Sequence, residues 1–379
     1  MKFILIPDSF KGTLSSSQIC AVMDEKIKKH FPDSLTVSIP VADGGEGSVD
    51  AFITAVGGVK EYVTVKNPYF EDMESYFGLI DAGQTAVIEM ASCAGLPLVE
   101  DRKDPRLTTT YGVGQLILAA ARKGVKKIIV GLGGSSTNDG GCGAAAAVGI
   151  RFYDRDGRQF IPTGGTTADI DRIDLSGRDS LLEQVEIVTM CDIDNPMYGP
   201  VGASFIFGPQ KGADEAMVLQ LDEGIRNLSR VIAQATGTDI SQVPGTGAAG
   251  AMGAGMIAFF GSRLQMGIQT VLDTVRFDEI IGDADYILTG EGKLDSQSLR
   301  GKVVIGIAER AKKQAKSVIA AVGGADDEIG KAYDMGVTAV FPINRLPQDF
   351  SVSRHRSQEN LAYTADNIIR LIKAGQGEH

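Results

Sequence analysis

The chain has 379 residues, a formal net charge of −11, no tryptophan and 43% hydrophobic residues. At about 100–200 residues per domain, this length predicts two domains. The acidic balance argues against nucleic acid as a partner, because binding to a phosphate backbone needs a basic face. The 47 glycines, about one residue in eight, indicate tight turns and places where backbones approach closely.

The chain shows no sign of export or of a membrane segment. Its first apolar run, residues 3–7, is too short for the core of a signal peptide. No run reaches the roughly 18 apolar residues of a transmembrane helix. The four cysteines stand singly, without metal-ligand or CxxC spacing. We therefore expect a cytoplasmic protein with reduced thiols and no membrane partner.

The first part of the chain has a βαβ pattern. Residues 2–7 and 35–41 are predicted strands, and a helix that Ser16 or Ser17 can cap lies between them. A strand, helix and strand in this order predict parallel pairing.

The pattern changes near residue 60. Residues 62–65, 74–80 and 85–89 form short strand patterns separated by turn signals. They predict an antiparallel meander, and a second domain is expected to begin here.

The middle of the chain mixes helices, strands and glycine-rich segments. We expect helices from 108, at 214–235 and at 270–281, and strands at 127–130 and 185–190. A hairpin is expected at 150–162. Glycine-rich segments lie at 131–143 and 244–255.

The tail returns to regular alternation of strands and helices. Strands are expected at 284–288, 317–322 and 337–342, and helices at 301–314, 327–334 and 360–374. The fold class is therefore α/β with two domains. A doubly wound, Rossmann-like parallel-sheet domain is expected from residues 1–60 and 282–379. A mixed-sheet α/β domain, 61–281, is inserted into it, with the active site in the cleft between them.

The loop after strand 127–130 is the strongest signal for nucleotide phosphates. Its sequence, GLGGSSTNDGG at 131–141, lets backbone N–H groups converge on a phosphate, and we expect the N-terminus of the following helix to add to them. It lacks the Gly-Lys-Ser/Thr end of a Walker A loop, and it does not match the dinucleotide pattern GxGxxG in its usual layout.

Carboxylates follow other predicted strands, at the edge where open α/β sheets bind ligands. Asp43 and Glu46 stand among glycines, which suits Mg²⁺ or hydrogen bonding to substrate hydroxyls. Asp8 follows the first strand and precedes Lys11 in a flexible turn. Asp192 leaves strand 185–190, where it can act as a general base or a metal ligand.

The loop TGEGKLDS at 289–296 combines glycines with Glu291 and Lys293, as an anion-handling site would need. Each of these loops also has a plainer interpretation. A glycine-rich turn is often only a tight connection, and an Asp after a strand is often a helix N-cap. The glycines of 245–255 could serve close helix packing. Five such loops at strand ends favour a functional interpretation.

The chain resembles the bacterial glycerate kinase family, which includes the glycerate 2-kinases. The resemblance runs in order from residue 1 to about residue 345, through PDSFKGTLSS, PVADGGEGS, GLGGSSTNDGG, CDIDNPMYGPVGAS, FGPQKGA, PGTGAAGAMG and TGEGKLDSQSLRGK. It implies phosphorylation of glycerate by ATP to 2-phosphoglycerate, with Mg²⁺. No residue identifies the attacking hydroxyl, so a kinase that makes 3-phosphoglycerate, or one for another small hydroxy acid, stays open.

Within this interpretation Asp43 and Glu46 hold Mg²⁺ or the glycerate hydroxyls. Asp192 is the preferred general base and Asp8 the second candidate. Lys11 and Lys293 are expected to neutralise the glycerate carboxylate or the transferred phosphate. The ATP-binding residues are Gly133, Gly134, Ser135, Ser136, Thr137, Asn138 and Glu291.

Other function classes fit the sequence less well. No histidine lies near a candidate loop, which disfavours a Ser–His–Asp hydrolase. A dehydrogenase would need GxGxxG directly after its first strand. A non-catalytic regulator would usually carry a DNA-binding or partner module, and no basic helix-turn-helix is evident. Whether the chain forms a homodimer is left open.

Overall fold

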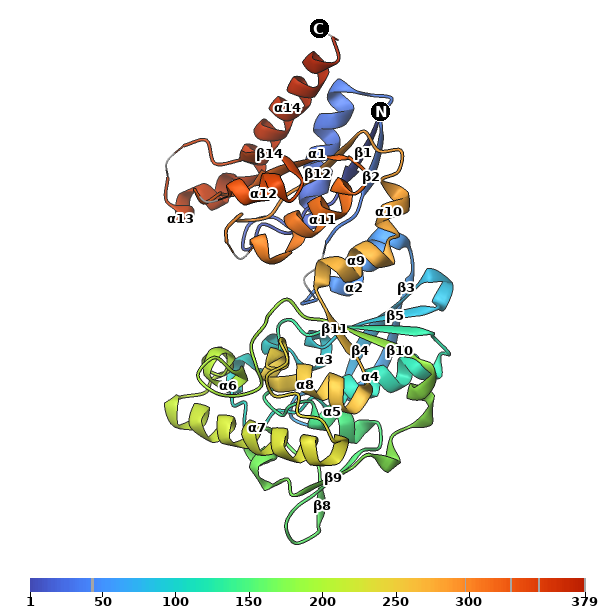
Figure 1. Ribbon diagram of the computed structural model, residues 1–379, viewed down its shortest axis with the longest axis vertical. Coiled ribbons are helices and arrows are strands. Elements are labelled where there is room, and N and C mark those ends of the chain that lie inside the picture. The colour runs from blue at the N-terminus through green and yellow to red at the C-terminus, as the bar shows by residue number, and fades with distance from the viewer. Residues whose placement is uncertain (42–43, 297, 328, 347, 378–379) are drawn as a thin grey trace. The chain divides into compact units, whose positions relative to one another are not determined.

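The computed structural model describes the chain except for residues 42–43, 297, 328, 347 and 378–379 (Figure 1). The chain divides into two compact units. Unit 1 comprises Met1–Ala42, Thr54–Val56 and Met266–His379, and unit 2 comprises Asp43–Ile53 and Gly57–Gln265. Among the described residues, no helix is both long and apolar enough to cross a bilayer.

Unit 1 is built on a five-stranded sheet in the order β14-β13-β12-β1-β2, and every pair in it is parallel. The strands are β1 (Lys2–Leu5), β2 (Leu35–Ser38), β12 (Tyr286–Thr289), β13 (Ser317–Val322) and β14 (Val337–Pro342). The predicted parallel sheet shared by the two ends of the chain is confirmed.

Helices cover this sheet. Phe3 and Leu5 of β1 pack into one apolar cluster with α1 and α14, while Ile4 between them is also fully buried. Such burial on both faces is typical of a parallel sheet. The helices of unit 1 are α1 (Ser16–His30), α9 (Gly267–Thr274), α10 (Phe277–Ile280), α11 (Val303–Lys312), α12 (Gly330–Asp334), α13 (Phe350–Ser353) and α14 (Ser357–Gly375).

The cap of α1 differs from expectation. Ser15 is the N-cap, and it forms a capping box with Gln18. Ser16 cannot serve because its hydroxyl donates to the carbonyl of Pro7 at 2.6 Å and accepts from the N–H of Val41 at 3.0 Å. Ser16 therefore ties the start of the helix to the segments that follow β1 and β2.

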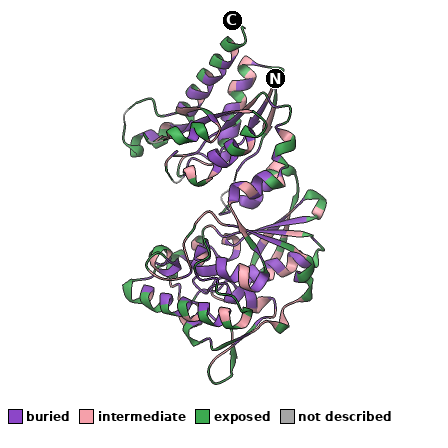
Figure 2. Ribbon diagram, in the orientation of Figure 1, coloured by how far each residue is buried: buried purple, intermediate pink, exposed green. Residues whose placement is uncertain are grey.

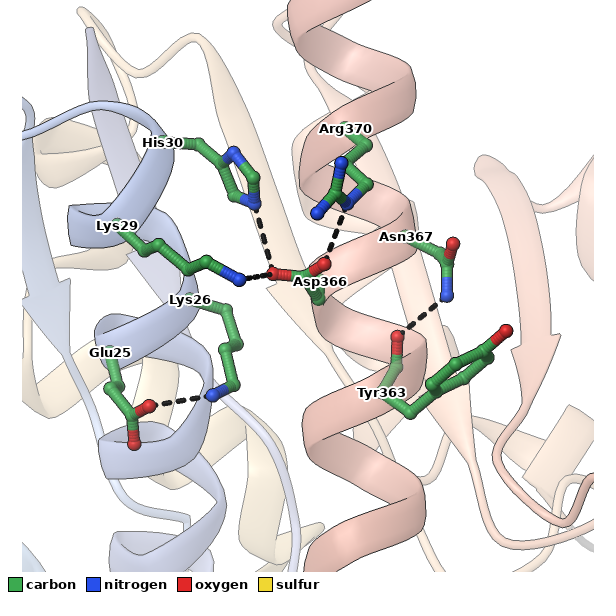
Figure 3. A network of polar contacts seen from close by, with 8 residues as sticks. All are labelled: Glu25, Lys26, Lys29, His30, Tyr363, Asp366, Asn367 and Arg370. Carbon is green, nitrogen blue, oxygen red and sulfur yellow. Dashed lines mark hydrogen bonds and ion pairs between the residues drawn. The ribbon is translucent and has the colours of Figure 1, made fainter.

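A polar network joins α1 to α14, which lie side by side (Figures 1 and 3). Lys29 Nζ and His30 Nε2 lie 2.8 Å and 2.9 Å from Oδ1 of Asp366, and Arg370 Nε donates to its Oδ2 at 2.7 Å. The hydrogen bonds from Lys29, Arg370 and His30 hold the pKa of Asp366 well below its usual range.

Unit 2 contains a six-stranded mixed sheet in the order β11-β10-β6-β5-β4-β3. The pairs β5–β4 and β4–β3 are antiparallel and the other pairs are parallel, so the predicted meander and the mixed sheet are both confirmed. The strands are β3 (Val59–Lys66), β4 (Asp72–Ile80), β5 (Thr85–Glu89), β6 (Lys127–Gly131), β10 (Glu186–Met190) and β11 (Arg263–Gln265).

A small antiparallel sheet, in the order β8-β7-β9, contains the predicted hairpin. Asp154 forms its turn, because its backbone carbonyl accepts from the N–H of Gly157 at 3.0 Å and its side chain accepts from the N–H of Asp156 at 2.9 Å. The strands are β7 (Arg151–Tyr153), β8 (Gln159–Phe160) and β9 (Arg172–Asp174).

Helix α7 of unit 2 buries one side and exposes the other, as Figure 2 shows. Leu221, Ile225, Leu228 and Ile232 of α7 are buried at helical spacing. The helices are α3 (Ala91–Ala94), α4 (Tyr111–Arg122), α5 (Cys142–Ala147), α6 (Ala203–Phe207), α7 (Glu215–Thr236) and α8 (Ala248–Phe260). The residues of α2 (Ser48–Val56) fall in both units.

The division into units differs from the expected insert boundaries of 61 and 281. Residues 267–280 belong to unit 1, where α9 packs against α11 and α10 packs against α9. A Cβ on Gly306 of α11 would lie 2.9 Å from Cγ2 of Ile268, and Arg310 pairs with Asp273 and Asp278. At the other boundary, unit 2 already begins with the segment that enters α2.

We predict that Asp366→Asn lowers the free energy of unfolding by about 1 kcal/mol near neutral pH, the usual scale of partly exposed ion pairs. The pKa of Asp366 is depressed in the folded state. The contribution of Asp366 to the free energy of unfolding is therefore present above its ordinary pKa of 3.8 and is lost as the pH falls below that value. Thermal unfolding near neutral pH and near pH 3 measures both effects. Glu25→Gln, on the exposed side of α1, is the control (Figure 3). Equal stability of Asp366→Asn and wild type near neutral pH would contradict the prediction.

Candidate active site

Two of the predicted site loops lie side by side at the end of β6. A Cβ on Gly131 would lie 2.3 Å from the carbonyl oxygen of Gly44, and one on Gly133 would lie 2.6 Å from Cα of Gly45. The N–H of Gly133 also donates to the carbonyl of Gly44 at 3.0 Å. The loop of Glu46 and the glycine-rich loop are therefore packed together without intervening side chains.

A buried glutamate anchors the segment that carries Glu46. Glu89 ends β5 with 1% of its surface exposed, and its Oε1 accepts from the N–H of Val49 in the first turn of α2 at 2.5 Å. Burial raises the pKa of Glu89, and hydrogen bonds from Val49 and Gly47 oppose the rise. The sequence interpretation missed this residue, although an acid at the end of an apolar strand is a recognisable signal.

The glycine-rich loop exposes only a few of its predicted ATP-binding residues. Gly134 is exposed and Gly133 half-buried, whereas Ser135, Ser136, Thr137 and Asn138 are buried. The hydroxyl of Ser136 donates to the carbonyl of Ala94 at 2.9 Å, which holds the loop against α3. The most accessible part of this loop is therefore its backbone at Gly133 and Gly134.

Asp139 fixes the far end of the same loop. Its carboxylate is fully buried and accepts from the N–H and hydroxyl of Thr110 at 2.8 Å and 2.9 Å, and from the N–H groups of Gly141 and Gly143 at 3.1 Å and 3.2 Å. Burial raises its pKa, and these hydrogen bonds oppose the rise.

This arrangement corrects one expectation. The first N–H groups of α5 were expected to point at a phosphate, but Gly141 and Gly143 donate to the carboxylate of Asp139. Asp139 therefore occupies the donors that a phosphate would have used.

A left-handed turn at the start of α8 holds the middle of the loop. Ala249, Gly250 and Ala251 all have positive φ, which costs roughly 1–2 kcal/mol for each alanine. A Cβ on Gly250 would lie 2.1 Å from the carbonyl oxygen of Thr137. The interpretation of the 245–255 glycines as close packing is thus confirmed at this position, and the packing partner is the glycine-rich loop itself.

Asp192 lies at the same edge of the sheet, half-buried just beyond β10. The residues around it pack closely on the segment before α8: the N–H of Gly247 donates to the carbonyl of Asn195 at 2.9 Å, and a Cβ on Gly245 would lie 2.9 Å from Sγ of Cys191. A Cβ on Gly44 would lie 3.2 Å from Cβ of Met190. Unit 2 thus gathers Glu46, the glycine-rich loop and Asp192 at the ends of β6 and β10.

Unit 1 has a second group of predicted site residues. Its strand order reverses between β1 and β12, and such a reversal is where open α/β sheets bind ligands. Asp8 follows β1 and Glu291 follows β12, and the N–H of Asp8 donates to the carbonyl of Gly290 at 2.8 Å. The two carboxyl groups therefore flank the reversal point of this sheet.

Glu291 carries a buried carboxyl group with a raised pKa. Glu291 is 6% exposed, and its buried Oε1 has no hydrogen-bond partner within the described part of the chain. Burial raises the pKa of Glu291 to about 7, and Asp8 adds to the rise while Ser298 opposes it. Near neutral pH a large fraction of Glu291 is therefore protonated and able to donate a hydrogen bond.

The two predicted lysines stand in the same part of unit 1. Lys293 forms an ion pair with Asp326 at 2.9 Å, and both side chains are about half exposed. Lys11 is exposed, and a Cβ on Gly292 would lie 3.6 Å from its backbone nitrogen. The pairing of Lys293 is of the weak, solvent-screened kind that an anionic ligand can replace.

A resident cage of protein ligands for a metal is absent from the described part of the chain, where no group of three or more His, Cys, Asp or Glu side chains could hold an ion. Mg²⁺ needs fewer, since one or two carboxylates together with substrate phosphates and water suffice. The exposed carboxylate of Glu46 beside the glycine-rich loop fits that requirement. Asp43, the other predicted ligand, lies outside the described residues.

The sequence profile of the "Glycerate kinase family" matches residues 3–373. The chain belongs to the glycerate kinase family. A protein of Escherichia coli K12 named glycerate 2-kinase is 41% identical over 376 residues, 99% of each chain. One of Bacillus cereus named glycerate kinase is 41% identical over 380 residues, the whole of both chains.

A crystal structure from Salmonella typhimurium LT2, solved as a candidate glycerate kinase 2, has the same fold. It aligns with a TM-score of 0.87 at 38% identity, over 100% of this chain and 99% of that one. The expected family and the two-part α/β fold class are therefore confirmed, and the chain is an enzyme of a phosphotransferase family.

We predict that Gly250→Ala destabilises the protein by about 3 kcal/mol, because a left-handed alanine is strained and its Cβ would collide with the backbone of Thr137. Gly261→Ala, at the other end of α8, is a matched control: its φ is +64°, close to the +67° of Gly250, but no atom lies within 4 Å of the added Cβ. It should cost only the strain, about 1 kcal/mol. Urea unfolding of both variants tests this, and equal losses would contradict the predicted collision.

We predict that Glu291→Gln changes how stability depends on pH. The pKa of Glu291 is raised from 4.5 to about 7. The contribution of Glu291 to the free energy of unfolding is therefore fully present below pH 4.5 and is lost as the pH rises through 7. Between these pH values the unfolding free energy of the wild type should fall relative to that of the variant, by on the order of 3 kcal/mol. Unfolding curves across this range measure the difference, with the exposed Glu309→Gln as control. Parallel curves for wild type and Glu291→Gln would refute the prediction.

Proposed function

We propose that this protein transfers the γ-phosphate of ATP to a hydroxyl group of glycerate and yields 2-phosphoglycerate. Membership of the glycerate kinase family supports the reaction, and the name of the Escherichia coli relative supports the product. Formation of 3-phosphoglycerate, or use of another small hydroxy acid, is the alternative. The proposed location is the cytoplasm, and the four cysteines are free thiols, as reduced conditions require.

The observation that carries the proposal is the convergence at the end of β6 and β10. There an accessible glycine backbone, an exposed carboxylate and a half-buried Asp lie at one edge of the unit 2 sheet. Phosphoryl transfer needs mainly positioning and charge neutralisation, together with a base for the hydroxyl. We assign the ATP phosphates to the loop at Gly133, Gly134 and Ser135, with Ser136, Thr137 and Asn138 shaping it from behind.

In the proposed step the glycerate hydroxyl oxygen attacks the γ-phosphorus. The bond from that phosphorus to the β–γ bridging oxygen breaks, ADP leaves, and the hydroxyl proton passes to Asp192. Asp8 is the second candidate for the base. Glu46, with Asp43, would hold Mg²⁺, which neutralises phosphate charge when bound.

The residues of unit 1 have complementary proposed roles. Lys11 and Lys293 would neutralise the glycerate carboxylate or the transferred phosphate. Glu291 would bind ATP, and in its protonated form it can donate a hydrogen bond to an oxygen of the nucleotide. That residues of both units act on one pair of substrates stays a prediction.

The direct test is a coupled assay of ADP release with each glycerate enantiomer and Mg-ATP. NMR of the phosphorylated product then identifies the hydroxyl that reacted. We expect ADP release that depends on glycerate, with phosphate on the 2-position. No release with either enantiomer would refute the proposal, and phosphate on the 3-position would favour the alternative. Stabilisation by NADH but not by ATP would instead favour a dehydrogenase.

We predict that Asp192→Asn lowers kcat by at least about 10²-fold, because removal of a general base costs 10²–10⁴-fold, and leaves KM for ATP nearly unchanged. The amide has almost the same shape but cannot accept the proton. Asp194→Asn, two residues further on and exposed, is the matched control and should retain activity. A near-normal kcat for Asp192→Asn would move the base elsewhere, first to Asp8.

A further inference from the structure

A lysine is buried directly behind the glycine-rich loop. Lys211, the last residue of a short 3-10 helix (Pro209–Lys211), is 1% exposed. Its Nζ donates to the carbonyl oxygen of Thr137 at 2.5 Å, its one hydrogen bond to the described part of the chain. An ammonium group has three N–H donors, and burying a charge costs several kcal/mol unless it is well paired. A stability role alone does not explain a lysine at this position.

The polar groups next to Lys211 are also incompletely paired. Oγ1 of Thr137 and Oδ1 of Asn138 are buried atoms that have no hydrogen-bond partner among the described residues. Nδ2 of Asn138 donates to Oγ of Ser204 at 3.2 Å. Buried polar atoms in native proteins nearly always find partners, so an incompletely paired group at a loop marks a place kept for something other than packing.

Among the described residues, one acidic group opposes the cost of burying the charge of Lys211. Asp139, at the end of the same loop, is the acid that acts on it. The neighbouring segment before α4 carries Lys103, which pairs with Glu100 at 3.8 Å. Asp214 caps α7 and accepts from a backbone N–H there. The sequences of α6 and α8 contain no charged residue.

We propose that Lys211 is a positioning residue of the phosphate loop: its ammonium group holds the carbonyl of Thr137, and its positive charge behind the loop strengthens the binding of ATP. This inference rests on the proposed function, since ATP at the glycine-rich loop is itself a proposal. Lys211 is too deeply buried to touch a phosphate, so it acts through the loop and through its field, which a protein interior screens less than water does.

The protonation of Lys211 supplies a specific readout. Burial lowers its pKa from 10.5 to about 7, and Asp139 opposes this shift. The charge is present below pH 7 and is lost above it, so the ATP affinity that depends on Lys211 falls as the pH rises. The unfolded chain keeps this proton up to pH 10.5, so Lys211 lowers stability at neutral pH and its removal does not unfold the protein.

Two variants separate the charge from the hydrogen bond. Lys211→Gln keeps a donor for the carbonyl of Thr137 without the charge, and Lys211→Met removes both. Calorimetric titration with ATP near pH 6 and near pH 8.5 compares them with the wild type, on either side of the Lys211 pKa. Lys103→Met, beside the same segment and partly exposed, is the matched control.

Near pH 6 we expect both Lys211 variants to bind ATP at least about tenfold more weakly than the wild type, which is the effect of one unit charge on another roughly 12 Å away at an effective dielectric constant of about 20. Near pH 8.5 Lys211→Gln should bind ATP nearly as the wild type does, because the wild-type lysine has then lost its charge, whereas Lys211→Met should stay weaker because it also lacks the hydrogen bond to Thr137. Lys103→Met should follow the wild type at both pH values. The ionisation of ATP itself is common to all the proteins and cancels in the comparison.

Wild-type affinity for Lys211→Gln near pH 6, or the same loss at both pH values, would overturn the inference while the proposed function stands. A wild-type protein that binds no ATP would overturn the proposed function and this inference together. Melting temperatures of the Lys211 variants at or above that of the wild type near pH 7 support the inference. A lower melting temperature for both would instead assign Lys211 to stability and overturn it.

Discussion

Direct contact between backbones is the constraint on which the unit 2 site depends. Gly131 and Gly133 lie against Gly44 and Gly45, and Gly250 lies against Thr137, at distances where a Cβ would collide with main-chain atoms. Loops that meet in this way cannot move independently, because each removes the space into which its neighbour would relax. Hydrogen bonds between the same segments, such as that from Gly133 to Gly44, add to this rigidity. Glycine-rich loops, which are flexible by composition, are thus closely packed in unit 2.

Buried polar groups complete the arrangement. Glu89 accepts from the start of α2, and Asp139 accepts four hydrogen bonds that join the glycine-rich loop to α4 and α5. Both carboxyl groups pay a desolvation penalty that hydrophobic residues would not. The ammonium group of Lys211 makes a single hydrogen bond to the described part of the chain, so Lys211 has the weakest structural justification of the three. This difference supports the proposal that Lys211 does more than shape the loop.

The two units provide different chemistry. Unit 2 offers an accessible backbone and the half-buried Asp192, whereas unit 1 offers Glu291 and exposed lysines beside the reversal in its strand order. A phosphoryl transfer reaction needs phosphate contacts, a base and cations that neutralise charge. The residues that the family resemblance singled out are therefore distributed over both units.

The sequence alone determined the α/β class, the parallel sheet of unit 1, the meander of β3 to β5 and the hairpin at Asp154, because period and turn chemistry are local properties. It also pointed to Glu291 and the glycine-rich loop, since strand ends are where chemistry gathers in such folds. It did not predict that α9 and α10 belong to unit 1, or that Ser15 rather than Ser16 caps α1. Nor did it assign roles to Glu89, Asp139 and Lys211. Those features depend on what lies opposite each residue across tens or hundreds of positions of chain, and only the tertiary structure decides which backbones and charges meet.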